Sequence, residues 1–266
     1  MDQRTLDARL QRYYGRDFDE AARLTARPVG RAELARVREL VGTRLEPGSR
    51  VLDVGGGAGV HATWLAAAGH VVTLVDPVPS QVATARTVGT FTAEVGDARA
   101  LTAADGSFDA VLLAGPLYHL VTREDRLQAL REAARVLRPG GRVFAAAISR
   151  TMGALDAVLR RRFTDLPAQA LVRLLETGDV ADEIRNPEPE FPGGHFHTAD
   201  ELADELAAAG FRDPWVTGVE GPGSLALELS GPDDDAVEAV LLLARQAEGD
   251  REAADVSSHL LGVATR

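Results

Sequence analysis

Three aspartates in the first hundred residues have the chemistry to bind a polar ligand. Asp53, Asp76 and Asp97 each stand at or next to the end of a short apolar run. A carboxylate in such a place accepts charge-assisted hydrogen bonds from hydroxyl and amino groups. Because parallel strands end at one edge of a sheet, where ligands bind, the three carboxylates are expected to line one crevice.

A glycine-rich turn follows the first of these aspartates. Gly55, Gly57 and Gly59 occupy every second position, and the residues from Val60 onward read as a helix. Glycine permits a sharp backbone turn and lets a ligand approach without a Cβ in the way. A strand, a glycine turn and a helix together form an entry for a phosphate or a nucleotide in an α/β sheet.

Apolar strands alternate with amphipathic helices through the first half of the chain. This order predicts a doubly wound, mostly parallel sheet of seven strands with helices on both faces. An antiparallel pair of closing strands is expected near the C-terminal end. The strands are predicted at 51–54, 71–75, 91–95, 108–113, 142–148, 215–220 and 225–229, and the last two helices at 233–247 and 252–261.

The chain is expected to form one domain with two additions to its sheet. Residues 1–45 are predicted to form an N-terminal helical lid, and residues 46–150 a Rossmann-like core that binds the cofactor. Residues 151–197 are predicted to form a helical cap, which is too short to carry a separate core. Residues 198–266 supply the closing strands and the C-terminal helices.

Two residue types that often do chemistry are missing. The 266 residues include no cysteine and no lysine, so all 29 basic residues are arginines. These absences exclude thiolate–zinc sites, a cysteine nucleophile, a lysine Schiff base and the lysine of a P-loop. The net charge of −11, without a basic stripe, argues against nucleic acid as a partner.

The hydropathy pattern predicts a cytoplasmic protein without a membrane contact. No apolar run approaches the roughly 18 residues that a membrane span needs, and the N-terminal residues lack the apolar segment of a secretory signal.

Three ligands compete for the glycine turn. The phosphate of a P-loop is excluded, and a dinucleotide fingerprint needs a third glycine where this chain has Val60. What remains is Asp53-x-Gly55-x-Gly57-x-Gly59, an acid at a strand end followed by alternate glycines. This pattern resembles motif I of the class I S-adenosylmethionine-dependent methyltransferases, in particular those that act on small molecules.

The resemblance extends from about Leu34 to Ile148 and implies S-adenosylmethionine as the cofactor. FDAVLLAGPLYHL is similar to the family's segment beside the methyl sulfonium, and LREAARVLRPGGRV to its helix before the fifth strand. By this resemblance Asp76, with Pro77, would bind the ribose hydroxyls. Asp97, with Ala98, would accept from the adenine amino group.

Two further residues have a structural alternative beside a cofactor role. Asp53 would contact the cofactor or orient the turn. The N-terminal segments YY…DE..RL and E..R.RE also resemble the small-molecule members of the family, and by that resemblance Arg36 would hold the cofactor's carboxylate. A guanidinium fork suits a carboxylate, while a solvated helix arginine is the alternative.

Transfer of a methyl group requires a positioned acceptor and, for a hydroxyl or a phenol, removal of a proton. Histidine titrates in the useful range. A metal site is not expected, because His195 and His197 lack a clear third ligand. The candidates are His119 and His197 as catalytic residues and Tyr14, Tyr118 and His195 as substrate contacts, with packing as the alternative for each; His61, His70 and His259 are interpreted as structural or surface residues.

The resulting hypothesis is a class I methyltransferase that transfers a methyl group to an O, N or C atom of a small molecule. One alternative is an NAD(P)-dependent oxidoreductase on a related sheet, against which the missing third glycine speaks. The other is a protein that binds S-adenosylmethionine without transferring its methyl group.

Overall fold

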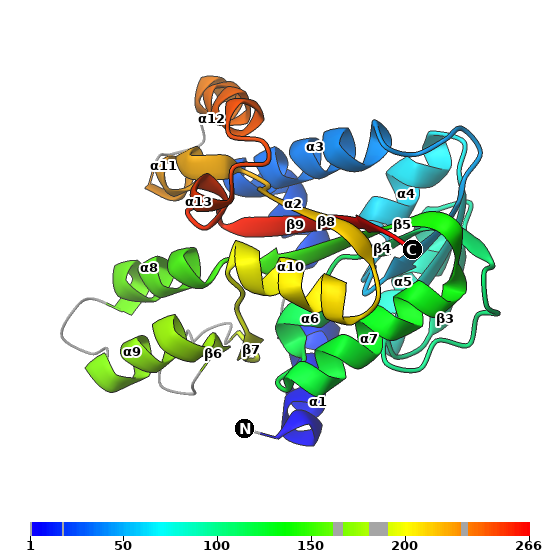
Figure 1. Cartoon of the computed structure of the whole chain (residues 1–266), viewed down its shortest axis with the longest axis horizontal. Coiled ribbons are helices and arrows are strands. Elements are labelled where there is room, and N and C mark those ends of the chain that lie inside the picture. The colour runs from blue at the N-terminus through cyan, green and yellow to red at the C-terminus, as the bar shows by residue number, and fades with distance from the viewer. Residues whose placement is uncertain (1, 18, 162–166, 181–190, 230–233) are drawn as a thin grey trace.

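A computed structural model describes residues 2–17, 19–161, 167–180, 191–229 and 234–266 of the chain. Its centre is a seven-stranded sheet in the order β3-β2-β1-β4-β5-β9-β8, in which β9 runs against the other strands (Figure 1). This is the predicted fold class. The strands of the sheet are β1 (Arg50–Val54), β2 (Val71–Asp76), β3 (Thr92–Val95), β4 (Phe108–Leu113), β5 (Leu137–Ile148), β8 (Arg212–Gly218) and β9 (His259–Thr265).

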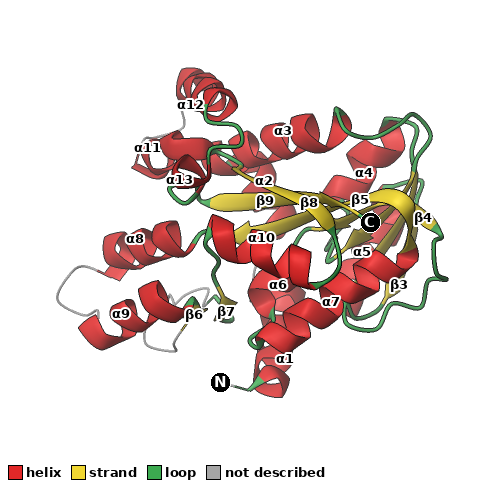
Figure 2. Ribbon diagram, in the orientation of Figure 1, coloured by secondary structure: helices red, strands yellow, loops and turns green. Residues whose placement is uncertain are grey.

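Helices cover both faces of the sheet (Figure 2). Side chains of α3, α4 and α5 pack on one face, and those of α7 and α10 pack on the other. Residues alternate between the two faces along β1 and β4, so both strands are buried on each side. The helices next to the sheet are α3 (Pro28–Gly42), α4 (Val60–Ala67), α5 (Pro79–Val88), α7 (Arg123–Val136) and α10 (Ala199–Ala208).

The prediction for the closing strands is wrong in one half. The first closing strand, predicted at 215–220, overlaps β8, but residues 225–229 lie in the helix α11 (Ser224–Leu229). The predicted helix 252–261 ends early as α13 (Arg251–Ala254), and β9 follows it. Short apolar runs fit a helix or a strand equally well. Residues 259–265 form a strand because they pair with β5 on one side and β8 on the other, where five of the seven residues of β9 are buried.

The N-terminal helices lie across the edge at which the central strands end. The side-chain nitrogen of Gln3 donates a hydrogen bond to the backbone carbonyl of His119. The side-chain oxygen of Gln3 accepts one from the backbone amide of Val121. The side chain of Gln11 donates to the carbonyl of Pro77. These bonds fasten the N-terminal segment to the loops after β2 and β4. The segment consists of α1 (Gln3–Arg12), the π-helix η1 (Tyr13–Asp17) and α2 (Glu20–Ala26).

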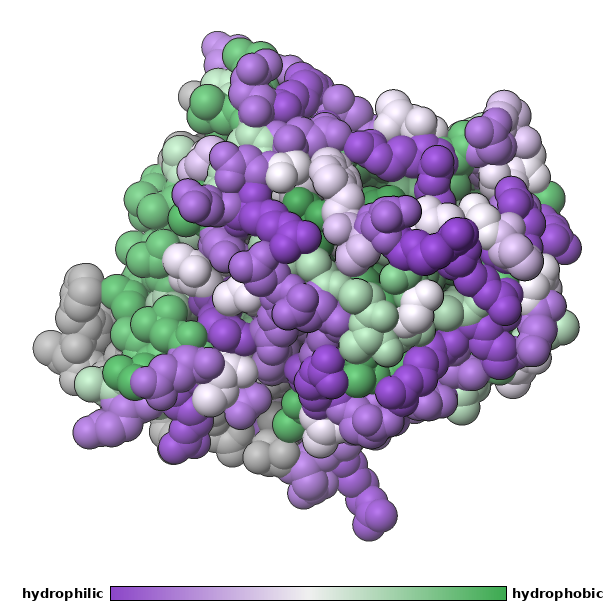
Figure 3. Space-filling model, viewed as in Figure 1, coloured by the Kyte–Doolittle hydropathy of each residue, from purple (hydrophilic) through white to green (hydrophobic). Residues whose placement is uncertain are grey.

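A smaller unit follows β5. Its own apolar cluster includes Ala157, Leu174 and Phe196, and exposed apolar side chains such as Leu159 and Val172 cover its outer side. Figure 3 shows this apolar surface at the end formed by α8 and α9. Residues 162–166 and 181–190 of the predicted cap lie outside the described residues. The unit contains α8 (Arg150–Arg161), α9 (Ala168–Thr177), β6 (Asp179–Val180) and β7 (Gly194–His195).

The remaining helices are short or lie near the C-terminal end. Within the described residues, none of the helices combines the length and the apolar character that a membrane span requires. These helices are α6 (Pro116–His119), the 3-10 turn η3 (Gly221–Gly223) and α12 (Asp234–Gln246).

The glycine turn has no room for a side chain at its centre. A Cβ on Gly56 would lie 2.6 Å from Asp53 Oδ2 and 2.6 Å from Leu74 Cδ1. We therefore expect Gly56→Ala to lower the free energy of unfolding by about 1–3 kcal/mol, measured by urea denaturation. Gly42→Ala is the matched control, because a Cβ there meets nothing within 4 Å and alanine favours a helix. Equal stability of the two variants would contradict the packing of the turn.

Candidate functional site

A cavity of about 350 Å³ lies where the central strands end. The glycine turn after β1, with Asp76 and Asp97, forms one part of its lining. Tyr14 and His119 belong to another part, to which the N-terminal segment and α6 contribute. The cavity therefore brings together residues from the N-terminal segment, from the ends of several strands and from β9.

Backbone atoms of the glycine turn border this cavity. Gly55 and Gly57 both have positive φ angles, 75° and 53°. A Cβ on Gly57 would meet only Gln81 Oε1 within 4 Å, so the missing side chain leaves open space beside the turn. Gly59 is not part of the cavity lining. A Cβ there would lie 2.7 Å from the ring of Phe91, so this glycine allows close packing of α4.

Asp76 joins the loops that follow β1 and β2. Its Oδ2 accepts a hydrogen bond from the amide of Gly57 at 2.9 Å, and its Oδ1 accepts one from the amide of Val78 at 2.8 Å. Burial raises the pKa of this carboxyl group. Asp76 and Pro77 both line the cavity, and each oxygen of Asp76 keeps a lone pair for a ligand hydroxyl.

Asp53 lies behind the turn rather than in the cavity lining. Its side chain is fully buried, and neither oxygen has a hydrogen-bond partner of ordinary geometry among the described residues. Burial and the nearby carboxylate of Asp76 raise its pKa to about 7. Of the two sequence interpretations of Asp53, this position favours orientation of the turn.

Asp97 and Ala98 line the cavity beyond the end of β3. The carboxylate of Asp97 accepts from the guanidinium of Arg99, at 2.6 Å to Nη2, and from the amide of the same residue at 2.8 Å. These bonds outweigh burial and lower the pKa of Asp97. Asp97 therefore stays ionised, with a guanidinium already beside it.

Arg36 is placed away from the cavity, which corrects its predicted role. Its side chain is 1% exposed, and its guanidinium pairs with Glu39 at 3.1 Å and with Glu248 at 2.5 Å. Arg36 is not among the residues that line the cavity. It faces the C-terminal part of the chain, an orientation that a helical pattern alone does not reveal.

His119 and Tyr14 form a hydrogen-bonded pair in the cavity wall. The hydroxyl of Tyr14 is 2.9 Å from Nε2 of His119, and Nδ1 lies 3.4 Å from the carbonyl of Gly193. Burial lowers the pKa of His119 to about 4, so the imidazole is neutral at pH 7. A proton on Nδ1 suits the carbonyl, and this tautomer leaves Nε2 to accept from Tyr14. Tyr118 also lines the cavity and stacks edge-on against His119.

His195 and His197 do not line the cavity, contrary to their predicted roles. Nε2 of His195 is 2.9 Å from Glu201, and Nε2 of His197 is 3.3 Å from Glu205. Burial lowers the pKa of His197. Both histidines connect the unit after β5 to α10. The tertiary position of β7, which the local sequence does not specify, turns them toward this helix.

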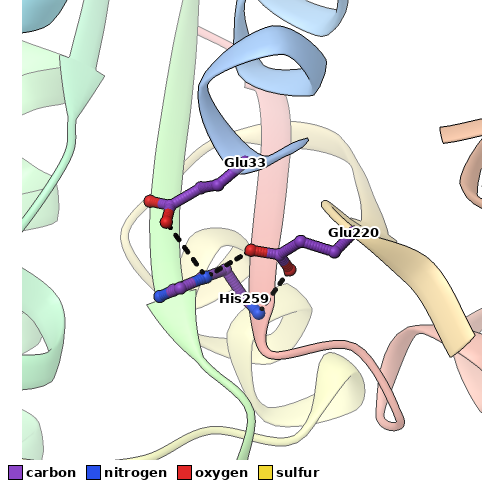
Figure 4. Close-up of side chains that lie close together, drawn as sticks. All are labelled: Glu33, Glu220 and His259. Atoms are coloured by element: carbon purple, nitrogen blue, oxygen red, sulfur yellow. Dashed lines mark hydrogen bonds and ion pairs between the residues drawn. The ribbon is translucent and has the colours of Figure 1, made fainter. Parts of the chain in front are cut away.

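Sequence reasoning missed a polar cluster in the cavity wall that Figure 4 shows. His259, the first residue of β9, lines the cavity together with Glu33. Its Nδ1 is 2.6 Å from Oε1 of Glu220 and 3.6 Å from Oε2 of Glu33. Burial opposes a charge on this imidazole, but the carboxylates of Glu33 and Glu220 outweigh it and raise the pKa to about 9.

The wrong prediction of a helix over 252–261 is the reason that sequence reasoning did not place His259 at the site. The run HLLGVAT fits a buried strand. With residue 259 at its start, this histidine belongs at the sheet edge, paired with Ile148 at the end of β5.

Comparison with known proteins agrees with this architecture. Residues 52–145 match the family model described as a methyltransferase domain. The ubiquinone biosynthesis O-methyltransferase of Xanthomonas axonopodis pv. citri is 35% identical over 147 residues, which cover 53% of this chain and 58% of that protein. Its counterpart in Xanthomonas oryzae pv. oryzae is 34% identical with the same coverage. The match thus spans little more than half the length of these curated relatives.

Solved structures share the fold over most of the chain. A methyltransferase of Methanosarcina mazei has a TM-score of 0.58 at 19% identity and covers 85% of this chain and 96% of its own. One from Mesorhizobium loti has a TM-score of 0.58 at 21% identity, with 87% and 98% covered. The likeness to these structures shows that the chain has their fold, and its segment 52–145 is similar to methyltransferase domains.

The pKa of Asp53 predicts a specific dependence of stability on pH. Between the ordinary value of 3.8 and about 7, the folded state binds more protons at this site than the unfolded state. The contribution of Asp53 to the free energy of unfolding therefore falls as pH rises through this range. We expect Asp53→Asn to gain stability relative to the wild type between about pH 4 and pH 8, measured by urea denaturation.

Asp109→Asn is the matched control for this experiment. The pKa of Asp109 is lowered by hydrogen bonds from the amide of Arg50 and the side chain of Arg138, so its titration lies below the tested range. Its stability relative to the wild type should stay constant over the same pH values. A constant difference for Asp53→Asn as well would contradict the raised pKa.

Proposed function

We propose that this protein transfers the methyl group of S-adenosylmethionine to an oxygen atom of a small molecule. The observation that carries the proposal is one continuous cavity with two kinds of lining. The glycine turn and Asp76 border it on the side of β1 and β2, and Tyr14, His119 and His259 border it elsewhere. The choice of oxygen is supported by the similarity to the ubiquinone biosynthesis O-methyltransferases described above.

The lining on the side of β1 to β3 fits the cofactor. Gly57 leaves the space that a Cβ would fill, and the buried carboxylate of Asp76 is suited to accept from a ribose diol. Ala98 and Asp97 would border the adenine. Bound there, the cofactor supplies a methyl group already activated by a sulfonium. The chain needs no metal or nucleophile of its own to activate this group.

The chain's contribution is to position the acceptor and to exclude water. The N-terminal segment, residues 1–45, would act as a lid, because Gln3 and Gln11 fasten it over the cavity. Holding the acceptor oxygen in line with the methyl group turns an encounter of two molecules into an intramolecular step. The unit over residues 151–197 would cap the acceptor, and residues 46–150 and 198–266 would form the sheet beneath it.

His119 and Tyr14 would orient the acceptor. The neutral imidazole holds the tyrosine hydroxyl at 2.9 Å, so the pair presents a fixed polar edge in the cavity. Tyr118 would contact the acceptor from the same helix, α6. A small-molecule acceptor, rather than a nucleic acid, is supported by the net charge of −11. We also place the protein in the cytoplasm as part of this proposal.

Calorimetry with S-adenosylhomocysteine, NAD and NADP tests the proposal. S-adenosylhomocysteine is expected to bind, and NAD and NADP are not, because a third glycine is missing from the turn. Asp76→Ala should weaken binding of S-adenosylhomocysteine by about 1–3 kcal/mol, the scale of a lost hydrogen bond to a charged group.

Asp105→Ala is a suitable control for this variant, since Asp105 pairs with Arg135 and is not part of the cavity lining. Binding of NAD in place of S-adenosylhomocysteine would refute the proposal. Binding without methylation of any compound in a broad panel of phenols and enols would favour a protein that only holds the cofactor.

His119→Ala is expected to slow methyl transfer to an acceptor from that panel while leaving the affinity for S-adenosylhomocysteine nearly unchanged. The reason is that loss of the imidazole removes the hydrogen bond between His119 and the Tyr14 hydroxyl without altering the glycine turn or Asp76. His70→Ala serves as the control, because His70 does not line the cavity. A turnover number equal to that of the wild type would remove His119 and Tyr14 from the acceptor site.

A further inference from the structure

His259 and the charged side chains around it form a hydrogen-bonded cluster in the cavity wall. Oε1 of Glu220 is hydrogen-bonded to Nδ1 of His259. Oε2 of Glu220 accepts a hydrogen bond from the hydroxyl of Ser257 at 2.9 Å and another from the backbone amide of His259 at 3.0 Å. The side chain of Glu220 is fully buried. These bonds hold the ring of His259 in one orientation from behind.

The second carboxylate has its own partner. Glu33 accepts two hydrogen bonds from the guanidinium of Arg23, at 2.7 and 3.1 Å. Two carboxylates therefore face one guanidinium and one imidazole, and the charges balance when His259 is protonated. The raised pKa agrees with this count, so His259 is an imidazolium at pH 7.

The other ring nitrogen of His259 makes no hydrogen bond within the part of the chain that the structure describes. Figure 4 shows Nδ1 between the two carboxylates and Nε2 at the far side of the ring, pointing away from both. Among the described residues no hydrogen bond to Nε2 is found, and this atom is not among the buried atoms without a partner. Because the residue lines the cavity, its free N–H donor is available to a molecule bound there.

We propose that His259, held by Glu220, is a binding site for an anionic oxygen of a small molecule in the cavity. The apolar neighbours Val219 and Leu261 also line this region, and a charged hydrogen bond gains strength in such surroundings. The inference rests on the proposed function, because that function defines which molecules enter the cavity.

Two molecules of the proposed reaction carry such an oxygen. The cofactor has a carboxylate, for which Arg36 is no longer available. The acceptor has a hydroxyl group that must lose its proton during O-methylation. If this hydroxyl is a phenol or an enol, it loses its proton to solvent, and the resulting anion would pair with the N–H of Nε2, which keeps its own proton. The cation beside the bound oxygen would lower the pKa of that phenol or enol. In the transfer itself, the bond from the oxygen to the methyl carbon forms as the bond from that carbon to the sulfonium sulfur breaks.

A metal ion at the same cluster is a weaker interpretation. Ligand atoms of Glu33, Glu220 and His259 lie within 4.8 Å of one another, which is close enough for shared coordination. Both carboxylates are already bonded to donors, however, and Nδ1 donates to Glu220 when the ring is charged. A cation would have to displace Arg23 and the proton of His259.

The experiment compares His259→Gln with the wild type in calorimetry. S-adenosylhomocysteine carries the carboxylate, and 5′-methylthioadenosine shares its nucleoside but lacks the amino-acid end. If the cofactor carboxylate is the ligand, His259→Gln should weaken the binding of S-adenosylhomocysteine by about tenfold or more. The same substitution should leave the affinity for 5′-methylthioadenosine unchanged. His70→Gln is the matched control, since His70 does not line the cavity and should match the wild type with both probes.

The acceptor is tested with 4-nitrophenol on protein saturated with S-adenosylhomocysteine. Absorbance reports the ionised form directly. If the acceptor oxygen is the ligand, the wild type should lower the apparent pKa of bound 4-nitrophenol relative to free probe, and His259→Gln should abolish this shift. In either case the advantage of the wild type over His259→Gln should shrink as pH rises through about 9.

The charged groups around this imidazole are Glu33 on α3, Glu220 after β8 and Arg23 on α2. His61 on α4 is the neighbouring titratable group, and burial lowers its pKa to about 4, so it is neutral at pH 7. The proposal is overturned if neither probe distinguishes His259→Gln from the wild type, or if Mg²⁺ or Mn²⁺ binds and requires His259.

Should His259→Gln fail to fold, NMR of wild-type protein with ¹⁵N-labelled histidine gives the same decision. The Nε2 resonance of His259 must then shift with S-adenosylhomocysteine or with 4-nitrophenol, and no shift with either overturns the proposal. If the wild type binds neither S-adenosylhomocysteine nor 5′-methylthioadenosine, the proposed function is refuted instead.

Discussion

The hydrogen bond from the Gly57 amide to Asp76 is the contact on which the site depends. It ties the turn after β1 to the end of β2, and the second oxygen of Asp76 holds the start of α5 through Val78. The positive φ angles of Gly55 and Gly57 favour glycine at the turn, and the burial of Asp76 requires that its carboxylate be satisfied by amides. Asp53 lies behind this turn, and its pKa is raised first by burial and then by the nearby carboxylate of Asp76.

Two histidines in one cavity show how surroundings decide chemical character. His119 is buried against aromatic rings and a carbonyl, so its pKa falls to about 4 and it stays neutral. His259 is 20% exposed and lies against two carboxylates, so its pKa rises to about 9 and it stays charged. Burial disfavours the charge in both cases, and only the neighbouring carboxylates reverse the outcome. The cavity therefore contains a neutral polar pair, Tyr14–His119, and a separate cationic donor.

A second buried network supports the unit after β5. Arg126 and Glu205 form an ion pair at 2.7 Å, and Glu205 also contacts His197. Removing one member would leave a buried charge without its partner, so such a network specifies one arrangement of α7, α10 and β7 more strongly than it adds stability. His195 and His197, which the sequence suggested for substrate contact and catalysis, contact Glu201 and Glu205 of α10 at this attachment.

Local periodicity and the backbone freedom of glycine are enough to predict the parallel sheet, the glycine turn and the places of Asp76 and Asp97 near the strand ends. Tertiary structure alone decided which charged side chains reach the cavity. Arg36 turned to Glu248, and β9 inserted between β5 and β8 and brought His259 to Glu220, across long separations in sequence. Local patterns place residues on a helix or a strand, but partners for buried charges come from elements that meet only after folding.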